Sequence, residues 1–166
     1  MLAIGIDPGT ASTGYGLVRE EPGQGIELVA YGVFSTLPQS SMPERLLELH
    51  RELGELLAVH RPDSGAVESL FFQRNVSTAI SVGQARGVIL LALAEASIPV
   101  SEYSPREVKQ AVAGYGGAEK HQMQEMVRVL LRMKENPRPD DAADALAVAI
   151  CHLHTQATRQ RTGEAT

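Results

Sequence analysis

Four acidic side chains stand at the ends of apolar stretches or near the start of a helical one. Asp7 closes the first apolar run of the chain, and Glu68 closes a short apolar segment near its middle. Asp141 and Asp144 stand three residues apart in the last helical stretch. Residues three apart on a helix share a face, and the ends of strands can converge on that face. The spacing therefore predicts a single cluster of four carboxylates.

A cluster of this kind requires protons or cations to balance its charge. At roughly 5 Å and an effective dielectric constant of about 20, each pair of like charges costs on the order of 3 kcal/mol. Hard divalent cations prefer oxygen ligands, and no set of cysteines and histidines is spaced for zinc. We expect two Mg²⁺ ions, with Mn²⁺ able to substitute, because such a pair suits in-line displacement at phosphorus. The predicted chemistry is hydrolysis of a phosphodiester.

Each acid also has an ordinary structural explanation. Asp before Pro-Gly is a common turn former, Glu68 suits an exposed strand end, and the dipole of a helix favours acids in its first turn. Asp140 stands four residues before Asp144 and shares its face, so the pattern does not choose between Asp140 and Asp141 as a member of the cluster. If Asp140 is not a member, it suits the N-cap of the last helix.

The hydrophobic pattern indicates an α/β domain whose strands and helices position these acids. Strands are predicted at 2–7, 14–20, 26–36, 65–67 and 98–104, and helices at 43–60, 77–97, 105–113, 118–133 and from about 140 to 154. This order predicts a mixed sheet with helices on its faces. Residues 88–94 are apolar on most sides, which predicts burial all round, within the domain or against a second copy. His152 and His154 are expected at the surface, where the last helix frays.

Length and composition indicate one domain. The chain has 166 residues, of which 43% are hydrophobic, and we expect a domain at 1–155 followed by a flexible polar tail at 156–166. One cysteine, Cys151, excludes an internal disulfide framework. The sequence shows neither a signal pattern nor an apolar run of membrane-spanning length, so a cytoplasmic protein is expected.

The net charge of −5 argues at first against a nucleic-acid partner, which usually requires a basic surface. If the four acids are clustered around cations, however, the rest of the surface is close to balanced. The charge therefore leaves a nucleic-acid partner open.

With these residues identified, the sequence resembles the RuvC family of Holliday-junction resolvases from about residue 2 to residue 154. The motifs GIDPGTASTGYG, ESLFFQRN, GQARGV, VKQAVAGYGGAEK and DAADALAVAI occur in the order of that family. The resemblance implies an RNase H-like fold with a five-stranded mixed β-sheet flanked by α-helices, and a homodimer. It also implies that Asp7, Glu68, Asp141 and Asp144 bind the metals, which favours Asp141 over Asp140.

An aromatic pair follows Glu68. Phe71 and Phe72 precede Arg74 and Asn75, so flat rings stand beside hydrogen-bonding groups. Aromatic rings stack on unpaired bases with about 1 to 3 kcal/mol per base. The resemblance implies that Phe71 or Phe72 contacts bases at the centre of a junction and that Arg74 lies near the DNA, and we expect Asn75 to bind DNA beside it.

Two of the three lysines in the chain fall within the matching motifs. The resemblance implies that Lys109 and Lys120 supply positive charge at a DNA-binding face, with Lys109 close to the scissile phosphate and part of the catalytic set. The ordinary alternative is that both lysines belong to solvated helix faces.

The activity implied by the resemblance is resolution of four-way DNA junctions in recombination and repair. Symmetric paired nicks require two sites related by a two-fold axis, as in a homodimer. Junction-binding and branch-migration proteins, RuvA and RuvB, are the implied partners. One alternative is an actin-like or sugar-kinase-type ATP-binding protein, because GIDPGTASTG also resembles its phosphate-binding turn, although those proteins need two domains. Another is a junction-binding subunit without catalysis.

Overall fold

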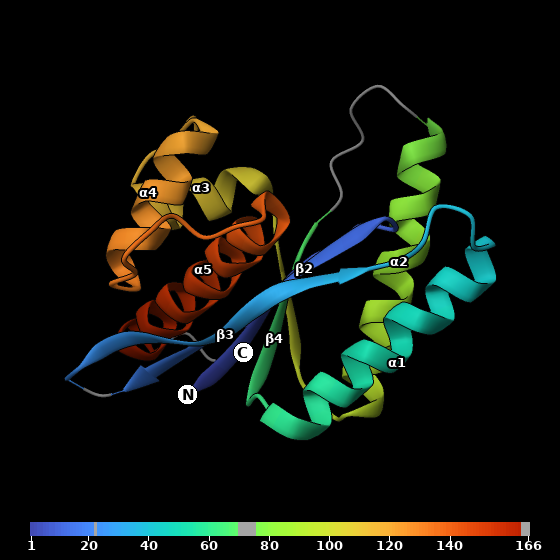
Figure 1. Cartoon of the computed structure of the whole chain (residues 1–166). Helices are drawn as coiled ribbons and strands as arrows, with labels where there is room; N and C mark the ends of the chain where they lie inside the picture. Colours follow the sequence, from blue (N-terminus) through green and yellow to red (C-terminus); the bar gives the residue numbers. More distant parts are fainter. Residues whose placement is uncertain (22, 70–75, 164–166) are drawn as a thin grey trace.

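Five strands form one mixed sheet in a computed structural model that describes residues 1–21, 23–69 and 76–163 (Figure 1). The strands are β1 (Leu2–Asp7), β2 (Ser12–Glu21), β3 (Gly25–Ser35), β4 (Ser64–Glu68) and β5 (Val100–Tyr103). Their order is β3-β2-β1-β4-β5. The first three strands form an antiparallel meander, and β4 and β5 add to β1 in parallel. The expected five-stranded mixed sheet is confirmed.

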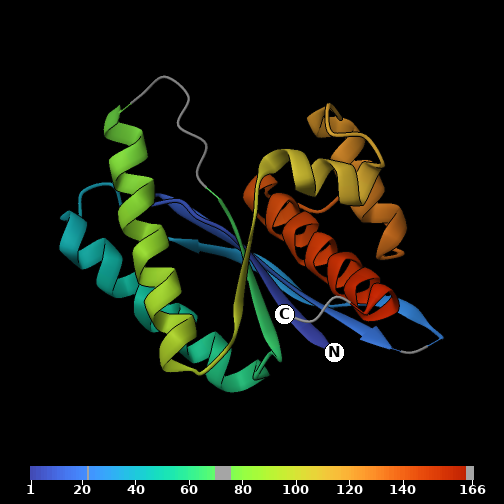
Figure 2. The same cartoon turned by 180° about the vertical axis from the view of Figure 1, so that it is seen from behind.

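Helices cover both faces of this sheet (Figures 1 and 2). They are α1 (Met42–His60), α2 (Val76–Glu95), α3 (Pro105–Ala113), α4 (Lys120–Leu130) and α5 (Asp140–Thr162). Helices α1 and α2 lie on one face, whereas α5 lies against the other and carries α3 and α4 on its outer side. A separate hydrophobic core fills each side of the sheet.

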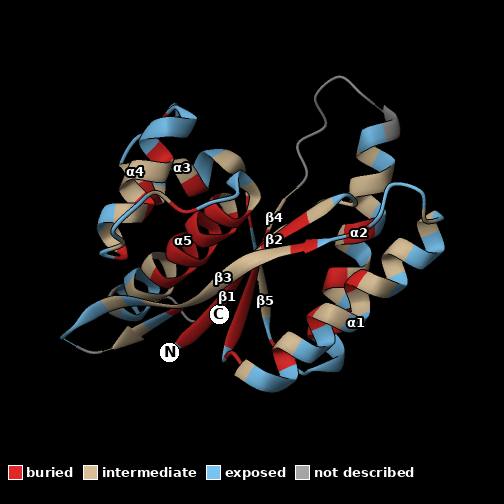
Figure 3. Cartoon of the chain, viewed as in Figure 1, coloured by how far each residue is buried: buried red, intermediate tan, exposed pale blue. Residues whose placement is uncertain are grey.

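Alternation along the central strands decides which side chains reach α5. On β1, Leu2, Ile4 and Ile6 enter the core beneath α1 and α2. The side chains between them, ending with Asp7, point to the α5 side. On β4, Val67 faces α1 and α2, so its neighbour Glu68 also points towards α5. Figure 3 shows how completely these strand centres are buried.

Glycines let α5 approach the sheet closely. A Cβ on Gly14 would collide with the carbonyl group of Asp141, and a Cβ on Gly5 would collide with the α5 backbone at Ala145 and Ala149. A Cβ on Gly16 would lie 2.9 Å from the Cα of Leu146. Any larger residue at these positions would push the helix away from β1 and β2.

Helix α5 begins near Asp140 as predicted, but its C-terminal end and its N-cap differ from the prediction. It continues to Thr162, so residues 156–162 of the expected tail are helical. At its start, Pro139 is the N-cap and Asp140 is the first helical residue, so the N-cap prediction for Asp140 is wrong. Asp140 is instead held by side chains of α4, which a local capping pattern cannot indicate.

The expected surface position of His152 is also wrong. Its side chain is only 1% exposed, with Nδ1 3.0 Å from the Tyr103 hydroxyl and Nε2 2.9 Å from Ser64 Oγ. Burial lowers the pKa of His152 to about 4, so the ring is neutral near pH 7. His154 is partly buried, with Nδ1 3.2 Å from the carbonyl oxygen of Ala111. The polar residues His152 and His154 suggested that this part of α5 is exposed. Packing of α5 on the sheet covers it instead.

Helix α2 is buried on only one side within this chain. Ile89 and Leu93 pack in the core, but Ile80 is 59% and Leu91 is 53% exposed. The expectation that the sequence has no apolar run of membrane-spanning length is wrong for Thr78–Glu95 of α2. This part of the helix is long and apolar enough, by length and composition only, to cross a membrane. Burial all round thus does not occur within the described part of this chain.

Candidate active site

Asp7 and Glu68 end neighbouring parallel strands on the same face of the sheet. Ile6 of β1 pairs with Val67 of β4, so the two acids that follow lie side by side. The two carboxyl groups act on each other electrostatically, since the charge of Glu68 raises the pKa of Asp7. The loop after Asp7 is fixed by Thr13, whose buried hydroxyl donates to the carbonyl oxygen of Gly9 at 2.5 Å.

The first turns of α5 bring the other two acids to this pair. Gly14 pairs with Asp7 across β1 and β2, and the carbonyl group of Asp141 packs directly on Gly14. The start of α5 therefore lies beside the end of β1. The carboxyl group of Asp7 interacts electrostatically with Glu68, Asp144 and Asp141. Asp7, Glu68 and Asp144 thus lie together at one end of the sheet, and Asp141 is close enough for its charge to act on Asp7.

Burial and mutual repulsion change the acidity of this group of acids. Burial is the main cause that raises the pKa of Asp7 to about 8. The charges of Glu68, Asp144 and Asp141 raise this pKa further, whereas the charge of Lys120 lowers it. Burial is also the main cause that raises the pKa values of Glu68 and Asp144. Burial and the neighbouring charges therefore favour the protonated form of Asp7 when no cation is bound.

Two lysines face the acids across a small cavity. The cavity has a volume of about 230 Å³, and its lining includes Glu68, Asp144, Lys109 and Lys120. Helix α3 presents Lys109 and begins at the predicted capping box, where the Ser104 hydroxyl accepts from the backbone N–H of Glu107. Lys109 lowers the pKa of Glu68 through its charge. The site thus joins a buried acidic side to a basic one.

Lys120 makes the ion pairs of this site. Its ammonium nitrogen lies 3.0 Å from Asp140 Oδ2 and 3.6 Å from Asp144 Oδ2. Hydrogen bonding to Asp140 is the main cause that raises the pKa of Lys120, and the same contact lowers the pKa of Asp140. The pairing of Lys120 with Asp140 has no sequence signal of its own, because the two residues come from different helices.

The donor set fits a hard divalent cation, since it consists of carboxylates whose repulsion a cation would relieve. Within the described residues, no group of three or more Asp, Glu, His or Cys side chains is placed so that it could hold a metal ion. Asp144 Oδ2 lies 3.6 Å from the Lys120 ammonium. The chemistry of the donors, rather than a completed ligand shell, favours Mg²⁺.

The predicted base-stacking and DNA-binding residues Phe71, Phe72, Arg74 and Asn75 lie outside the described residues. In the sequence they follow Glu68 closely, which is a member of the acidic cluster. Their roles stay predictions.

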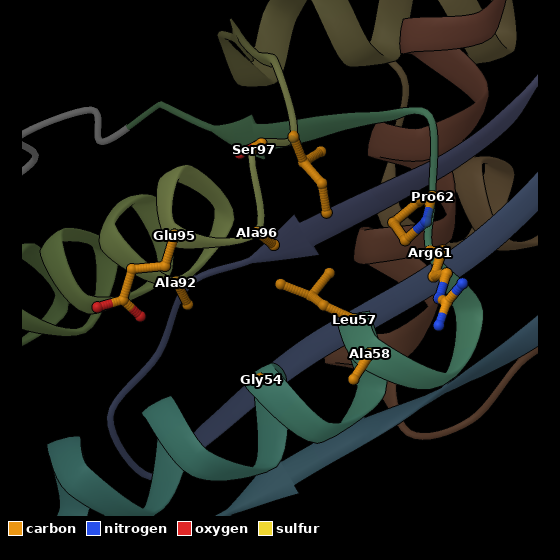
Figure 4. A pocket seen from close by; sticks show the side chains of 10 residues that line it. Gly54, Leu57, Ala58, Arg61, Pro62, Ala92, Glu95, Ala96 and Ser97 are labelled. Atoms are coloured by element: carbon orange, nitrogen blue, oxygen red, sulfur yellow. The ribbon is translucent and has the colours of Figure 1, made fainter.

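A larger hollow of about 530 Å³ lies between the C-terminal ends of α1 and α2 (Figure 4). It is located at the end of the sheet where β4 begins, whereas Asp7 and Glu68 stand where β1 and β4 end. Small and apolar residues make up most of its lining, with Arg61 and Glu95 as its ionisable side chains. This hollow contains none of the clustered acids.

A mixed five-stranded sheet covered by helices, with carboxylates gathered where its central parallel strands end, defines a nuclease of the RNase H-like class. The family model described as "Crossover junction endodeoxyribonuclease RuvC" matches residues 3–152. The chain belongs to the RuvC family of crossover junction endodeoxyribonucleases.

Individual relatives agree with this membership over nearly the whole chain. The RuvC protein of Chloroflexus aggregans is 59% identical over 163 residues, which cover 98% of this chain and 99% of the relative. The structure "T. thermophilus RuvC in complex with Holliday junction substrate" superposes with a TM-score of 0.87 at 39% identity, covering 95% of this chain and 96% of the other. The yeast mitochondrial Holliday junction resolvase Ydc2 has a TM-score of 0.72 at 14% identity, covering 96% and 80%, and supports the fold alone.

Proposed function

We propose that this crossover junction endodeoxyribonuclease resolves four-way (Holliday) DNA junctions by symmetric paired nicks in recombination and repair. The observation that carries the proposal is the convergence of Asp7, Glu68 and Asp144 with Lys109 and Lys120 at one site. Family membership supports the same activity, and the T. thermophilus relative binds a Holliday junction substrate. Membership of this family argues against the ATP-binding alternative.

In this proposal Asp7, Glu68, Asp141 and Asp144 hold Mg²⁺, the ion that the family generally uses. When bound, a pair of such ions supplies an activated water and stabilises the leaving oxygen, and Mn²⁺ can replace Mg²⁺. The partly buried position of the carboxylates favours cation binding, because it strengthens their repulsion when no cation is present. The carboxylates fix where the scissile phosphate must lie.

Lys109 and Lys120 provide the positive charge on the other side of the cavity. The charge of Lys109 lowers the pKa of Glu68. Lys109 is proposed to lie close to the scissile phosphate. Phe71 or Phe72 is proposed to stack on bases at the junction centre, with Arg74 and Asn75 contacting DNA beside it. In this proposal, α3 and α4 contact the phosphate backbone of the DNA, and the segment that follows β4 contacts its bases.

Paired nicks require a second copy of the site, and α2 offers a surface for one. Its exposed residues include Ile80, Gly87, Leu91 and Ala94, spaced at three, four or seven residues along one side of the helix. A Cβ on Gly87 would meet nothing within 4 Å. We propose that this stripe, called the α2 stripe below, packs against a second copy of the chain in a homodimer.

The remaining proposals concern the setting of the protein. We propose one nuclease domain at 1–155 followed by the polar segment 156–166. RuvA and RuvB, which bind junctions and drive branch migration, are the proposed partners. The proposed location is the cytoplasm.

The first test replaces Asp7 by Asn and measures both binding and cleavage of a synthetic four-way junction. Asp7→Asn keeps the shape of the side chain but removes its capacity to become a carboxylate. Cleavage in Mg²⁺ should fall by about 100-fold or more, as for loss of a central catalytic group, while junction binding persists. Glu27→Gln, an exposed change on β3, is the control and should cut normally.

Three outcomes would count against the proposal. Normal cleavage by Asp7→Asn would remove the metal role of the cluster. Binding without cleavage by the unaltered protein in both Mg²⁺ and Mn²⁺ would favour the junction-binding subunit. Tight ATP binding would restore the ATP-binding alternative.

A further inference from the structure

The carboxylate of Asp140 is engaged on both of its oxygens at the edge of the acidic cluster. Oδ2 lies 3.0 Å from the Lys120 ammonium, and Oδ1 accepts a hydrogen bond of 2.9 Å from the Gln124 side-chain amide. Lys120 and Gln124 stand four residues apart on α4, and Asp140 and Asp144 stand four apart on α5. Lys120 and Gln124 share one face of α4, and Asp140 and Asp144 share one face of α5. These two faces meet where α4 packs against α5.

The ammonium of Lys120 lies unequally between two carboxylates. It is 3.6 Å from Asp144 Oδ2, which is 0.6 Å farther than its distance to Asp140 (3.6 − 3.0). An ammonium and a divalent cation compete for the same carboxylate, because each neutralises its charge. A Lys120 without Asp140 would have Asp144 as its nearest carboxylate among the described residues.

We propose that Asp140 is a positioning residue that, steadied by Gln124, holds the Lys120 ammonium beside Asp144 rather than on it and so leaves Asp144 free to bind a divalent cation. The inference rests on the proposed function in taking Asp144 as a metal ligand. Asp140 itself touches no reacting group and acts through Lys120.

The size of the effect follows from the exposure of these groups. The side chains of Lys120 and Asp140 are 53% and 61% exposed, and that of Asp144 is 39% exposed. Ion pairs at such positions are screened by water, so loss of Asp140 should weaken cation binding by about two- to five-fold rather than abolish it. Because Asp140 is exposed, its replacement should leave the fold intact.

The test measures binding of Mn²⁺ to the metal-free protein without DNA, by the electron paramagnetic resonance of unbound Mn²⁺. Asp140→Asn should raise the Mn²⁺ dissociation constant by about two- to five-fold. Gln124→Leu, which changes no charge, should raise it in the same direction by a smaller factor. Glu135→Gln removes one negative charge at an exposed position on the α4–α5 connection and should leave the constant unchanged.

A double-mutant cycle with Lys120→Met separates positioning from simple loss of charge. Lys120→Met alone should bind Mn²⁺ more tightly, because no ammonium then competes for Asp144. In that background Asp140→Asn should have almost no further effect. If Asp140→Asn weakens Mn²⁺ binding equally with and without Lys120, Asp140 acts directly by its charge and the proposal is overturned.

Asp144→Asn distinguishes a failure of this inference from a failure of the proposed function. If Asp144→Asn leaves Mn²⁺ binding unchanged, Asp144 is not a ligand and the proposed metal site fails with the inference. If Asp144→Asn abolishes binding while Asp140→Asn has no effect, only the positioning role of Asp140 is lost.

Discussion

Asp7 is a carboxyl group held where the folded chain favours its neutral form. Burial raises its pKa to about 8 from an ordinary value near 3.8, and the other acids of the cluster add to the effect. Between these two pH values the unfolded chain releases a proton that the folded chain keeps. The metal-free protein therefore loses stability as the pH rises through this range, and the loss is complete above the folded-state pKa.

This linkage predicts that Asp7→Asn stabilises the metal-free protein, and more so at pH 8 than at pH 5. The gain at pH 8 should exceed the gain at pH 5 by roughly 3 to 4 kcal/mol, since Asn cannot ionise. Urea unfolding in the presence of a chelator at both pH values measures it. Addition of Mg²⁺ should then stabilise the unaltered protein but not the variant. An equal gain at pH 5 and pH 8 would show that ionisation of Asp7 is not the cause.

At the scale of elements, the close packing of α5 on β1 and β2 joins the separate parts of the site. Gly14, which pairs with Asp7, permits this close packing. A Cβ on Gly14 would collide with the carbonyl group of Asp141. The position of the two α5 acids thus depends on a residue that has no side chain of its own.

Gly14→Ala should therefore displace the start of α5 from the sheet. We expect a loss of about 1 to 3 kcal/mol in unfolding free energy, as for other overpacked sites, together with weaker Mn²⁺ binding. Gly54→Ala is the matched control, because a Cβ there meets nothing within 4 Å and alanine favours the helix interior by about 0.5 to 1 kcal/mol. Urea unfolding and Mn²⁺ titration of both variants measure the two effects. Unchanged stability and metal binding in Gly14→Ala would refute the role of this contact.

The sequence predicted the types of these elements because their hydrophobic periods are strong and local. The capping box at Ser104 and the strand that ends at Asp7 both occur as predicted. Contacts between distant segments were not predictable from such periods. The burial of His152 depends on Tyr103 and Ser64, which lie on two different strands.

The same limit applies within the site. Spacing suggested that the acids converge, and the structure brings them together through strand pairing and alternation. The pairing of Lys120 with Asp140 depends on how α4 packs against α5, so no spacing within either helix could indicate it.

At the scale of the whole molecule, the described part of the chain presents an acidic site and, on α2, an apolar side that the rest of the chain leaves uncovered. Ile80 and Leu91 of the α2 stripe are more than half exposed, although the opposite side of α2 packs in the core. Contiguous exposed apolar surface marks interaction sites, and the α2 stripe is proposed to be one. A second copy placed there would supply the second active site that symmetric nicking requires.

Leu91→Glu should convert the proposed dimer into monomers, because a carboxylate would be buried in the contact between two α2 stripes. Sedimentation velocity at micromolar concentration measures the change, and Val59→Glu, at an exposed position on α1, is the matched control. Since each site lies within one chain, Mn²⁺ binding per chain should be unchanged. On a junction carried by a supercoiled plasmid, the monomer should nick one strand and release few linear products, whereas the control should linearise the plasmid by paired cuts. A dimer that survives both Leu91→Glu and the added Ile80→Glu would place the interface elsewhere on the chain.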